Sequence, residues 1–361
     1  MSKQRICILG LGYVGLPLAM AISDHYSTIG YDINIDRINE LKSGYDTTKE
    51  VSSDVLKNTK IEFTSDLTEI ASANIYIITV PTPVDNANVP DLSALIDATE
   101  KVAKFIKSRD IVVYESTVFP GATNEICGPL LEKISGLKCN EDFFLGYSPE
   151  RINPGDKVHS IDRVTKIVSG SSDWALKQIS SVYNSFLGDN ICAVSSIEVA
   201  ETAKIIENIQ RDVNIGLMNE LAKICNKLGI DTNEVIDAAS TKWNFIPFRP
   251  GLVGGHCIGV DPYYLTHKAS QLKLHPEVIL AGRRINEGMV GFCSEQFVKK
   301  MTLDEQSCSR RKVLILGAAF KENCTDTRNS KVYELAEKIN QYGCDVEIFD
   351  PIISQLTNEN K

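Results

Sequence analysis

The stretch RICILGLGYVG, residues 5–15, decides the fold of this 361-residue chain. The apolar run at residues 6–9 predicts a buried strand, and Gly10, Gly12 and Gly15 follow it at the spacing of a dinucleotide-binding turn. In such a turn the first glycine makes the tight bend, the second admits a pyrophosphate close to the backbone, and the third lets the helix pack on the strand. The amides at the helix N-terminus then receive the phosphates.

A carboxylate at the end of the next predicted strand extends this prediction. The strand expected at residues 28–32 ends at Asp32, close to the offset of about 20 residues at which an acid hydrogen-bonds the ribose hydroxyls. A carboxylate there repels a 2′-phosphate, so the sequence favours NAD over NADP as cofactor. A structural glycine turn that binds no dinucleotide is the alternative.

Further apolar runs at residues 75–80, 111–114 and 143–147 alternate with helix-like stretches. Strands separated by helices predict a parallel sheet with helices on both faces. Thr82 and Thr117 come directly after two of these strands, where ligands of doubly wound sheets bind, so both are candidate cofactor contacts. Turn chemistry and helix capping are the alternative roles for these two threonines.

The rest of the chain predicts two more domains. Ser195 and Glu198 have the pattern of a capping box that opens a long helix, which runs to the break at Gly229. Near the end, strand-like runs at residues 312–316 and 345–349 and a helix-like run at 331–342 repeat the strand, glycine turn and helix theme of the start. We therefore expect an α/β protein with a Rossmann domain (residues 1–196), a central all-α domain built on the long helix (197–301) and a partial C-terminal Rossmann-like domain (311–361).

Composition excludes several classes of protein. With 38 basic against 47 acidic side chains the net charge is -9, which gives no electrostatic footprint for nucleic acid. No apolar run reaches the length of about 18 residues that a membrane span needs, and no signal peptide is recognisable, so we expect a cytoplasmic protein without membrane insertion. The 10 cysteines include no Cys-x-x-Cys pair, so we expect neither a metal site nor a disulfide framework.

Three polar residues share one stripe of the long predicted helix. Lys204, Asn208 and Arg211 fall at positions i, i+4 and i+7. On pattern alone this stripe favours a solvated face. If a second domain covers it, the same three side chains become convergent donors for an anionic substrate.

A glycine-rich segment at residues 254–262 contains a candidate nucleophile. Cys257 lies between the glycines and Asp261, and it can attack a substrate if its thiolate is stabilised. A buried, inert cysteine in a tight loop is the alternative. His256 has no partner at metal-ligand spacing.

Taken together, these motifs closely resemble those of the UDP-sugar 6-dehydrogenases, the UDP-glucose/GDP-mannose dehydrogenase family. In chain order they are the glycine-rich start, VPTP at 80–83, ESTVFPG at 115–121, PERINPG at 149–155, Lys204 with Asn208, GGHCIGVDP at 254–262, and FKEN at 320–323 leading to DTR at 326–328. The resemblance covers the whole chain.

The resemblance implies a reaction and a role for each motif. Family members oxidise the C6 hydroxymethyl of a nucleotide sugar to a carboxylate in two hydride transfers to two NAD. Cys257 matches the nucleophile, which captures the C6 aldehyde as a thiohemiacetal and then carries a thioester that water hydrolyses. Lys204 matches a residue of proton transfer or oxyanion stabilisation, Asn208 its partner, and Asp261 a carboxylate that positions water and base.

The resemblance also implies two sets of binding residues. Matches to substrate-binding positions are Arg151, Ile152, Lys204, Asn208, Arg211, Arg249, Gly254, Phe320 and Lys321. Matches to NAD contacts are Gly10, Gly12, Tyr13, Val14, Gly15, Asp32, Thr82, Thr117 and Arg328, with Arg37 as a further ribose candidate.

Departures from the family pattern bear on the substrate. Members acting on UDP-glucose usually carry Glu where Pro154 stands and Lys where Val260 stands. Pro154 cannot act as acid or base, so that role falls on Glu150, Lys204 or an ordered water. The segments KWNF at 242–245 and FRPGLV at 248–253 look most like those of UDP-N-acetylglucosamine or UDP-N-acetylgalactosamine dehydrogenases of surface polysaccharide synthesis.

We therefore expect an NAD-dependent oxidation of a UDP-N-acetylhexosamine by a homodimer formed around the central domain. UDP-glucose and UDP-N-acetylmannosamine are alternative substrates. A 3-hydroxyacid dehydrogenase, which performs one oxidation without a cysteine, is the rival enzyme class. A non-catalytic NAD-binding protein also stays open, because the family's third domain normally continues well past Asp350 and is expected to be partial here.

Overall fold

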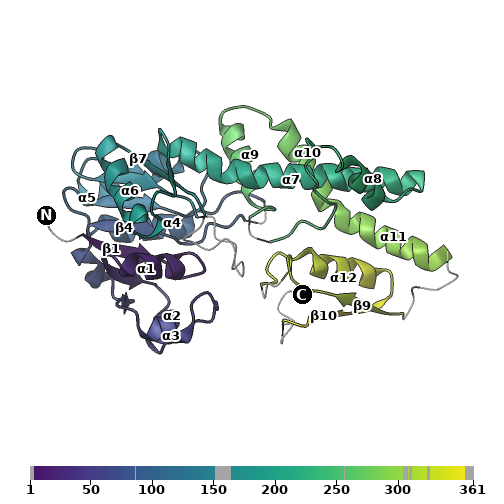
Figure 1. Cartoon of the computed structure of the whole chain (residues 1–361), viewed down its shortest axis with the longest axis horizontal. Helices are drawn as coiled ribbons and strands as arrows, with labels where there is room; N and C mark the ends of the chain where they lie inside the picture. Colours follow the sequence, from purple (N-terminus) through teal and green to yellow (C-terminus); the bar gives the residue numbers. More distant parts are fainter. Residues whose placement is uncertain are drawn as a thin grey trace. The chain divides into compact units, whose positions relative to one another are not determined.

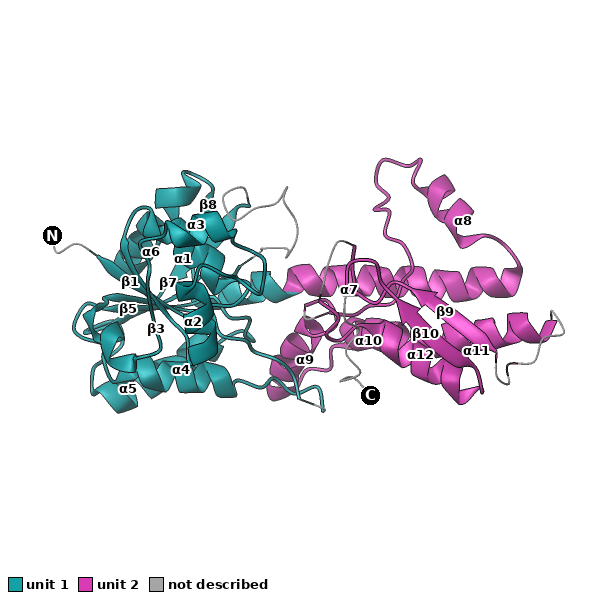
Figure 2. Ribbon diagram, turned by 90° about the horizontal axis from the view of Figure 1, so that it is seen from below, with its two compact units in different colours: residues 1–205 teal, residues 206–361 magenta. Residues whose placement is uncertain are grey.

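The computed structural model describes residues 4–85, 87–150, 164–255, 257–303, 308, 311–322 and 326–353. The chain divides into two compact units, Met1–Ile205 and Ile206–Lys361, which Figure 2 colours separately. The boundary falls within the long helix α7 (Ile197–Leu228), so this helix contributes to both units. The mixed α/β architecture confirms the predicted fold class.

The first unit is built on one eight-stranded sheet with the order β3-β2-β1-β4-β5-β6-β7-β8. All neighbours pair in parallel except β6 and β7, which are antiparallel. The chain moves outward from β1 to β3 and then returns to β4, which creates the switch point at which such sheets bind dinucleotides. The strands are β1 (Arg5–Leu9), β2 (Ser27–Tyr31), β3 (Glu62–Thr64), β4 (Ile75–Ile78), β5 (Ile111–Tyr114), β6 (Phe144–Tyr147), β7 (Lys166–Gly170) and β8 (Ile191–Ala193).

Helices cover this sheet and bury its central strands. Strands β4 and β5 are buried at every position, because continuous apolar runs suit a sheet that is covered on both faces. The core cluster includes Ile6 and Ile8 of β1 and Leu16 and Leu18 of α1. The helical segments are α1 (Gly15–Ser23), α2 (Ile35–Lys42), α3 (Ser53–Lys57), the 3₁₀ helix η1 (Leu67–Ser72), α4 (Ser93–Ala103), the π-helix η2 (Thr123–Cys127), α5 (Gly128–Ser135) and α6 (Asp173–Leu187).

The long helix α7 differs from its prediction at its first turn. Ser196, not Ser195, caps the helix, since its side chain accepts a hydrogen bond from the Val199 amide at 3.3 Å. The helix ends at Leu228 and is followed by Gly229 with φ +73°, the left-handed conformation typical of a glycine after a helix.

The second unit contains the rest of α7 and two kinds of structure, helices and a small sheet (Figure 1). A Cβ at Gly216 of α7 would lie 3.2 Å from the Cα of Gly282, so this glycine pair lets α7 and α10 approach closely. Among the described helices, none combines the length and the apolar composition that a membrane span requires. The elements are α8 (Thr232–Ala239), α9 (Asp261–Gln271), α10 (Glu277–Glu287), α11 (Met289–Leu303), β9 (Lys312–Leu316), α12 (Lys331–Gln341) and β10 (Asp345–Phe349).

The small sheet of the second unit consists, in the described part of the chain, of β9 and β10 paired in parallel. Exposure alternates along both strands, as expected for a sheet with one covered face. Leu314, Leu316 and Phe349 are 58%, 74% and 55% exposed, and we call them the bare face of this sheet.

Candidate active site

The predicted glycine turn has the geometry of a dinucleotide cradle. Gly10 has φ +94°, and a Cβ at Gly15 would lie 1.8 Å from the Gly10 carbonyl oxygen, so packing of α1 on β1 requires both glycines. A Cβ at Gly12 would meet nothing within 4 Å. Open space over the Gly12 backbone is what the close approach of a pyrophosphate needs, so these residues fit an NAD molecule.

Asp32 is held at the end of β2 by two backbone amides. Its carboxylate oxygens accept hydrogen bonds from Leu11 at 2.8 Å and from Asn34 at 2.9 Å. The carboxylate is half-buried and keeps further lone pairs for ribose hydroxyls. Tyr13 and Val14 lie in the turn that leads into α1, and both are half-buried.

Arg37 of α2 contacts the same turn. Its Nε donates to the Leu11 carbonyl at 2.9 Å, and its guanidinium pairs with Glu40 at 2.9 Å and with Asp46 at 2.8 Å. Burial opposes ionisation of Asp46, but hydrogen bonds from Thr48, from a backbone amide and from Arg37 outweigh it and lower the pKa of the carboxyl. If Arg37 contacts a ribose, it does so with a guanidinium that also pairs with Glu40 and Asp46.

The two predicted cofactor threonines come together at the carboxyl edge of the sheet. Thr82 follows β4 and donates its hydroxyl hydrogen to the Thr117 carbonyl after β5 at 2.6 Å. A second bond, from Ser116 to the Val80 carbonyl at 2.6 Å, ties the same two loops. The structure therefore makes one polar surface from two loops that are far apart in sequence.

Glu201 of α7 anchors the loop that follows Thr117. Its carboxylate accepts hydrogen bonds from the Gly121 amide at 2.5 Å and the Thr123 amide at 3.0 Å. Burial raises the pKa of Glu201 to about 7, although these hydrogen bonds act in the opposite direction. Glu201 was outside the predicted set, but its place three residues before Lys204 puts it on the same polar stripe.

That polar stripe is not a solvated face at its first two predicted positions. Lys204 and Asn208 are only 7% and 4% exposed, so the solvated interpretation is wrong for both. Arg211 is half-buried and lies 3.6 Å from Glu207. The exposed residues of α7 include polar ones, such as Glu207 and Glu220, and also four apolar ones, namely Val199, Ile206, Leu217 and Ile224.

Cys257 lies in the turn that precedes α9. Its carbonyl accepts hydrogen bonds from the Val260 amide at 3.1 Å and the Asp261 amide at 2.8 Å, which closes the turn. Asn208 donates to the buried carboxylate of Asp261 at 2.6 Å, so α7 holds this turn from the side. The thiol of Cys257 is exposed, and the residue stands four positions before the start of α9.

Cys257 is more exposed than most of the other described cysteines. Burial raises the pKa of Cys127 to about 12, and it raises that of Cys7 further. Such thiols are inert toward electrophiles. Cys192, on the edge strand β8, is exposed like Cys257.

The glycine pair before Cys257 packs against the second predicted substrate segment. A Cβ at Gly254 would lie 2.6 Å from the Asn329 carbonyl oxygen, and a Cβ at Gly255 would lie 2.8 Å from the Phe320 ring. The structure therefore brings the predicted substrate positions Gly254 and Phe320 together. Lys321 lies beside them, with its ammonium 5.8 Å from the Phe320 ring centre.

Two arginines that were predicted to contact ligands pair with acidic side chains close to them in the sequence. Arg249 is exposed and bonds Asn233 at 3.1 Å and Asp237, both on α8 and not on the Cys257 turn. Arg328 makes a two-pronged contact with Asp326 at 2.9 and 2.7 Å and is also exposed. Both guanidinium groups are therefore accessible to solvent.

A buried ion pair supports the Cys257 turn and was outside the predicted set. Arg283 of α10 lies 2.7 Å from Asp212 of α7, and a Cβ at Gly259 would be 3.8 Å from the Arg283 guanidinium. Asn286 donates to the same Asp212 carboxylate at 2.8 Å. Burial raises the pKa of Asp212 against the effect of Arg283. Asp212 lies one helical turn after Asn208, and this spacing is the sequence feature that could have indicated its role.

Glu150 is buried at the carboxyl edge of the first unit and is 8% exposed. Its carboxylate lies 2.6 Å from the ammonium of Lys166, another residue outside the predicted set. The neighbouring predictions Arg151 and Ile152 lie outside the described residues.

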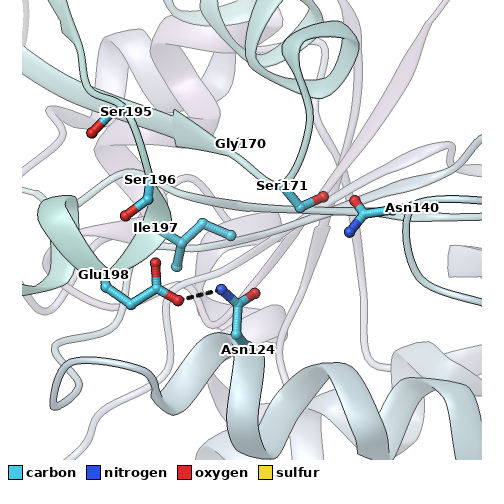
Figure 3. Close-up of a pocket in the computed structure, with 8 residues that line it drawn as sticks. All are labelled: Asn124, Asn140, Gly170, Ser171, Ser195, Ser196, Ile197 and Glu198. Atoms are coloured by element: carbon cyan, nitrogen blue, oxygen red, sulfur yellow. Dashed lines mark hydrogen bonds between the residues drawn. The ribbon is translucent and has the colours of Figure 1, made fainter.

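A polar hollow of about 250 Å³ lies elsewhere on the first unit (Figure 3). It is lined by Asn124, Asn140, Gly170, Ser171, Ser195, Ser196, Ile197 and Glu198. A hydrogen bond of 2.6 Å from Asn124 to Glu198 connects two of its walls. None of these eight residues belongs to the predicted site.

The sequence matches three profiles of the UDP-glucose/GDP-mannose dehydrogenase family: the NAD binding domain over residues 4–187, the central domain over 198–288 and the UDP binding domain over 314–361.

Relatives with similar sequences and structures cover nearly the whole chain. Protein CapL of Staphylococcus aureus is 55% identical over 348 residues, which are 96% of this chain and 82% of the relative. The UDP-N-acetyl-D-glucosamine 6-dehydrogenase of Pseudomonas aeruginosa is 52% identical over 355 residues, 98% of this chain and 84% of the relative. The structure of UDP-D-ManNAc dehydrogenase from Pyrococcus horikoshii matches with a TM-score of 0.90 at 33% identity, over 99% of this chain and 86% of that chain.

Proposed function

Because the chain belongs to the UDP-glucose/GDP-mannose dehydrogenase family of NAD-dependent enzymes, we propose that it oxidises C6 of UDP-N-acetyl-D-glucosamine to the uronate. The observation that carries this proposal is the 52% identity to a UDP-N-acetyl-D-glucosamine 6-dehydrogenase, against 33% to the UDP-D-ManNAc enzyme. UDP-N-acetylgalactosamine is the second candidate substrate. Pro154 and Val260 support an acetamido sugar, since UDP-glucose enzymes usually carry Glu and Lys there.

Cys257 is the proposed nucleophile. Oxidation of the C6 alcohol gives an aldehyde and releases one proton. The thiol then adds to this aldehyde carbon, which makes it tetrahedral and able to give up a second hydride. The resulting thioester is hydrolysed by water, which returns the thiol and yields the carboxylate. The exposure of Cys257 and its place before α9 support this role.

Lys204, Asn208 and Asp261 are proposed to manage charge and protons at C6. The Lys204 ammonium stabilises negative charge that develops on the C6 oxygen. The 2.6 Å bond from Asn208 to Asp261 fixes both side chains, so that the Asp261 carboxylate can orient the hydrolytic water. Glu150 is proposed as an acid–base group, because Pro154 cannot fill that role.

NAD accepts the hydride in each of the two oxidations. Gly10, Gly12 and Gly15 form its pyrophosphate cradle, with Tyr13 and Val14 in the same turn. Asp32 is proposed to accept hydrogen bonds from the ribose, with Arg37 behind it. Thr82, Thr117 and Arg328 complete the proposed contacts.

Substrate binding is proposed to use the segments around Gly254 and Phe320. Lys321, Arg211 and Arg249 offer cations to the diphosphate or the sugar, with Arg151 and Ile152 as further contacts. The packing of Phe320 on Gly254 and Gly255 supports the first part of this proposal.

The outward stripe of α7 is the proposed dimer contact. Val199, Ile206, Leu217 and Ile224 are 45–55% exposed and recur on one side of the helix. Two copies that pack these stripes together would bury an apolar surface that water otherwise contacts. A homodimer by gel filtration with light scattering is the expected result.

The similarity to protein CapL of Staphylococcus aureus supports a place in capsule or other surface polysaccharide synthesis. A uronate made for that purpose is a nucleotide-linked building block, and its NAD and UDP-sugar reactants favour the cytoplasm.

The test is NADH formation, followed at 340 nm, with a panel of UDP-sugars and purified enzyme. Two NADH for each UDP-N-acetylglucosamine, with higher kcat/KM than for UDP-glucose, is the expected result. One NADH per substrate would show a single oxidation and would contradict the proposed route through a thioester. No NADH with any UDP-sugar would favour a non-catalytic NAD-binding protein, and a preference for UDP-glucose or UDP-N-acetylmannosamine would overturn the substrate assignment.

A further inference from the structure

A buried charge cluster lies beside Glu150 in the first unit. The Lys166 ammonium is 2.6 Å from the Glu150 carboxylate and 2.9 Å from that of Glu115. Tyr183 donates its hydroxyl hydrogen to the other oxygen of Glu115, and its ring centre is 5.1 Å from the ammonium. These four residues are 0–8% exposed, so water hardly reaches the cluster.

The sheet order brings these residues to the ligand edge. Glu115 directly follows β5, and Glu150 follows β6 by three residues. Since β7 runs antiparallel to β6, its first residue, Lys166, lies beside the end of β6. The carboxyl ends of parallel strands are where doubly wound sheets bind their ligands.

Among the described residues, two carboxylates contact one ammonium in an environment that water hardly reaches. Burial, with Glu150 nearby, raises the pKa of Glu115 to about 7 against the effect of Lys166 and Tyr183. Burial acts to lower the pKa of Lys166, but the two carboxylates outweigh it and raise that pKa, so the lysine stays charged.

Stability alone gives little reason to keep such a cluster. Replacing a buried ion triad by apolar residues is often neutral or stabilising, because desolvation cancels much of the attraction. Buried, perturbed groups at a ligand edge are more typical of functional sites.

We propose that Lys166 is a positioning residue that holds the Glu150 carboxylate in place for proton transfer at C6, with Glu115 as its second anchor. This inference rests on the proposed function. The ammonium, 2.6 Å from one Glu150 oxygen, fixes the orientation of this carboxylate. Glu115 and Tyr183 keep the ammonium in this position, and the raised pKa of Glu115, about 7, lets it take up a proton near neutral pH.

The experiment compares Lys166→Met, Lys166→Arg and a control, Lys101→Met, whose half-buried lysine pairs with Asp97 on α4. For Lys166→Met, kcat should fall about tenfold to hundredfold while KM for NAD stays unchanged, because a misplaced acid–base group slows the reaction without touching the cofactor turn. The acidic limb of the kcat/KM profile should move to higher pH, since loss of the Lys166 charge makes both carboxylates hold a proton more tightly. Lys166→Arg should restore most of the rate, and Lys101→Met should match the wild type.

A second variant keeps the test decisive if Lys166→Met does not fold. Glu115→Gln leaves one carboxylate with one ammonium, so the acidic limb should move to lower pH, opposite to Lys166→Met. If the Lys166→Met enzyme has the wild-type kcat and pH profile, the role of Lys166 is refuted while the proposed function stands. The same holds if the acidic limb of the Glu115→Gln profile lies at the wild-type pH. A wild-type enzyme that oxidises no UDP-sugar overturns the proposed function and this inference with it.

Discussion

The turn between β1 and α1 offers two glycine substitutions with opposite expected consequences. Gly15→Ala should destabilise the protein, because the new methyl group would lie 1.8 Å from the Gly10 carbonyl oxygen and 2.4 Å from the Thr79 hydroxyl. Gly12→Ala should leave stability unchanged, because nothing lies within 4 Å of its new methyl group and Gly12 has no positive φ. The same methyl group should weaken NAD binding, since it occupies the space that the pyrophosphate needs.

The sizes of both effects follow from this geometry. Alanine in place of a helical glycine normally gains about 1 kcal/mol, but overpacking costs about 1–3 kcal/mol. At Gly15 the opposing atom is backbone, so the turn itself has to move and the loss should lie at the upper end. A net loss of about 2 kcal/mol lowers Tm by roughly 4–8 °C in a unit of this size. At Gly12 a similar overpacking against bound NAD raises Kd about tenfold to hundredfold.

The assay combines thermal unfolding without cofactor and NAD titration by calorimetry, on both variants and the wild type. The reasoning is refuted if Gly12→Ala lowers Tm as much as Gly15→Ala does. It is also refuted if Gly12→Ala binds NAD with the wild-type Kd.

Three more predictions test the cofactor, the nucleophile and a buried acid. Asp32→Ala should shrink the preference for NAD over NADP in kcat/KM by about tenfold or more, because it removes both a ribose acceptor and a like charge, and an unchanged ratio contradicts the assignment. Cys257→Ala should stop uronate formation, whereas Cys192→Ala, at another exposed cysteine, should not; product analysis by mass spectrometry distinguishes them. The raised pKa of Glu201, about 7 in the folded protein against 4.5, means that the folded state keeps a proton which the unfolded chain has lost across that window. The free energy of unfolding, measured in urea, should therefore fall as pH rises from about 4.5 to 7. For Glu201→Gln this free energy should fall less steeply with pH, and equal slopes for variant and wild type would exclude this role.

Local pattern was enough to predict the first half of the dinucleotide unit. Strands at residues 5–9 and 111–114 coincide with β1 and β5, because a continuous apolar run next to a glycine turn leaves few alternatives. The runs at 312–316 and 345–349 likewise coincide with β9 and β10. No predicted run corresponds to β3, β7 or β8; of these, β3 and β8 have three residues each and are too short to show a period.

Contacts between distant segments were beyond prediction from pattern. Periodicity says that Lys204 and Asn208 share a face of α7 but not whether that face is covered. The partners of Lys166 come from β5 and from the segment after β6, and only the observed strand order makes them neighbours. Arg283 and Asp212 meet because α10 packs on α7, a contact that no spacing in the sequence encodes.

The bare face of β9 and β10 has a consequence for how the protein behaves at high concentration. Within the described residues this sheet has two strands and an apolar face, and the edge of such a sheet can accept a strand from another molecule. Such growth is open-ended, because each added strand presents a new edge, whereas packing of two α7 stripes about a two-fold axis stops at two copies. If the average molar mass from light scattering reaches a plateau as the protein concentration rises, the contact is between α7 helices. If the molar mass keeps rising, the contact is through the sheet. Leu316→Lys should suppress only the climbing component, which makes it a useful background for every measurement of assembly.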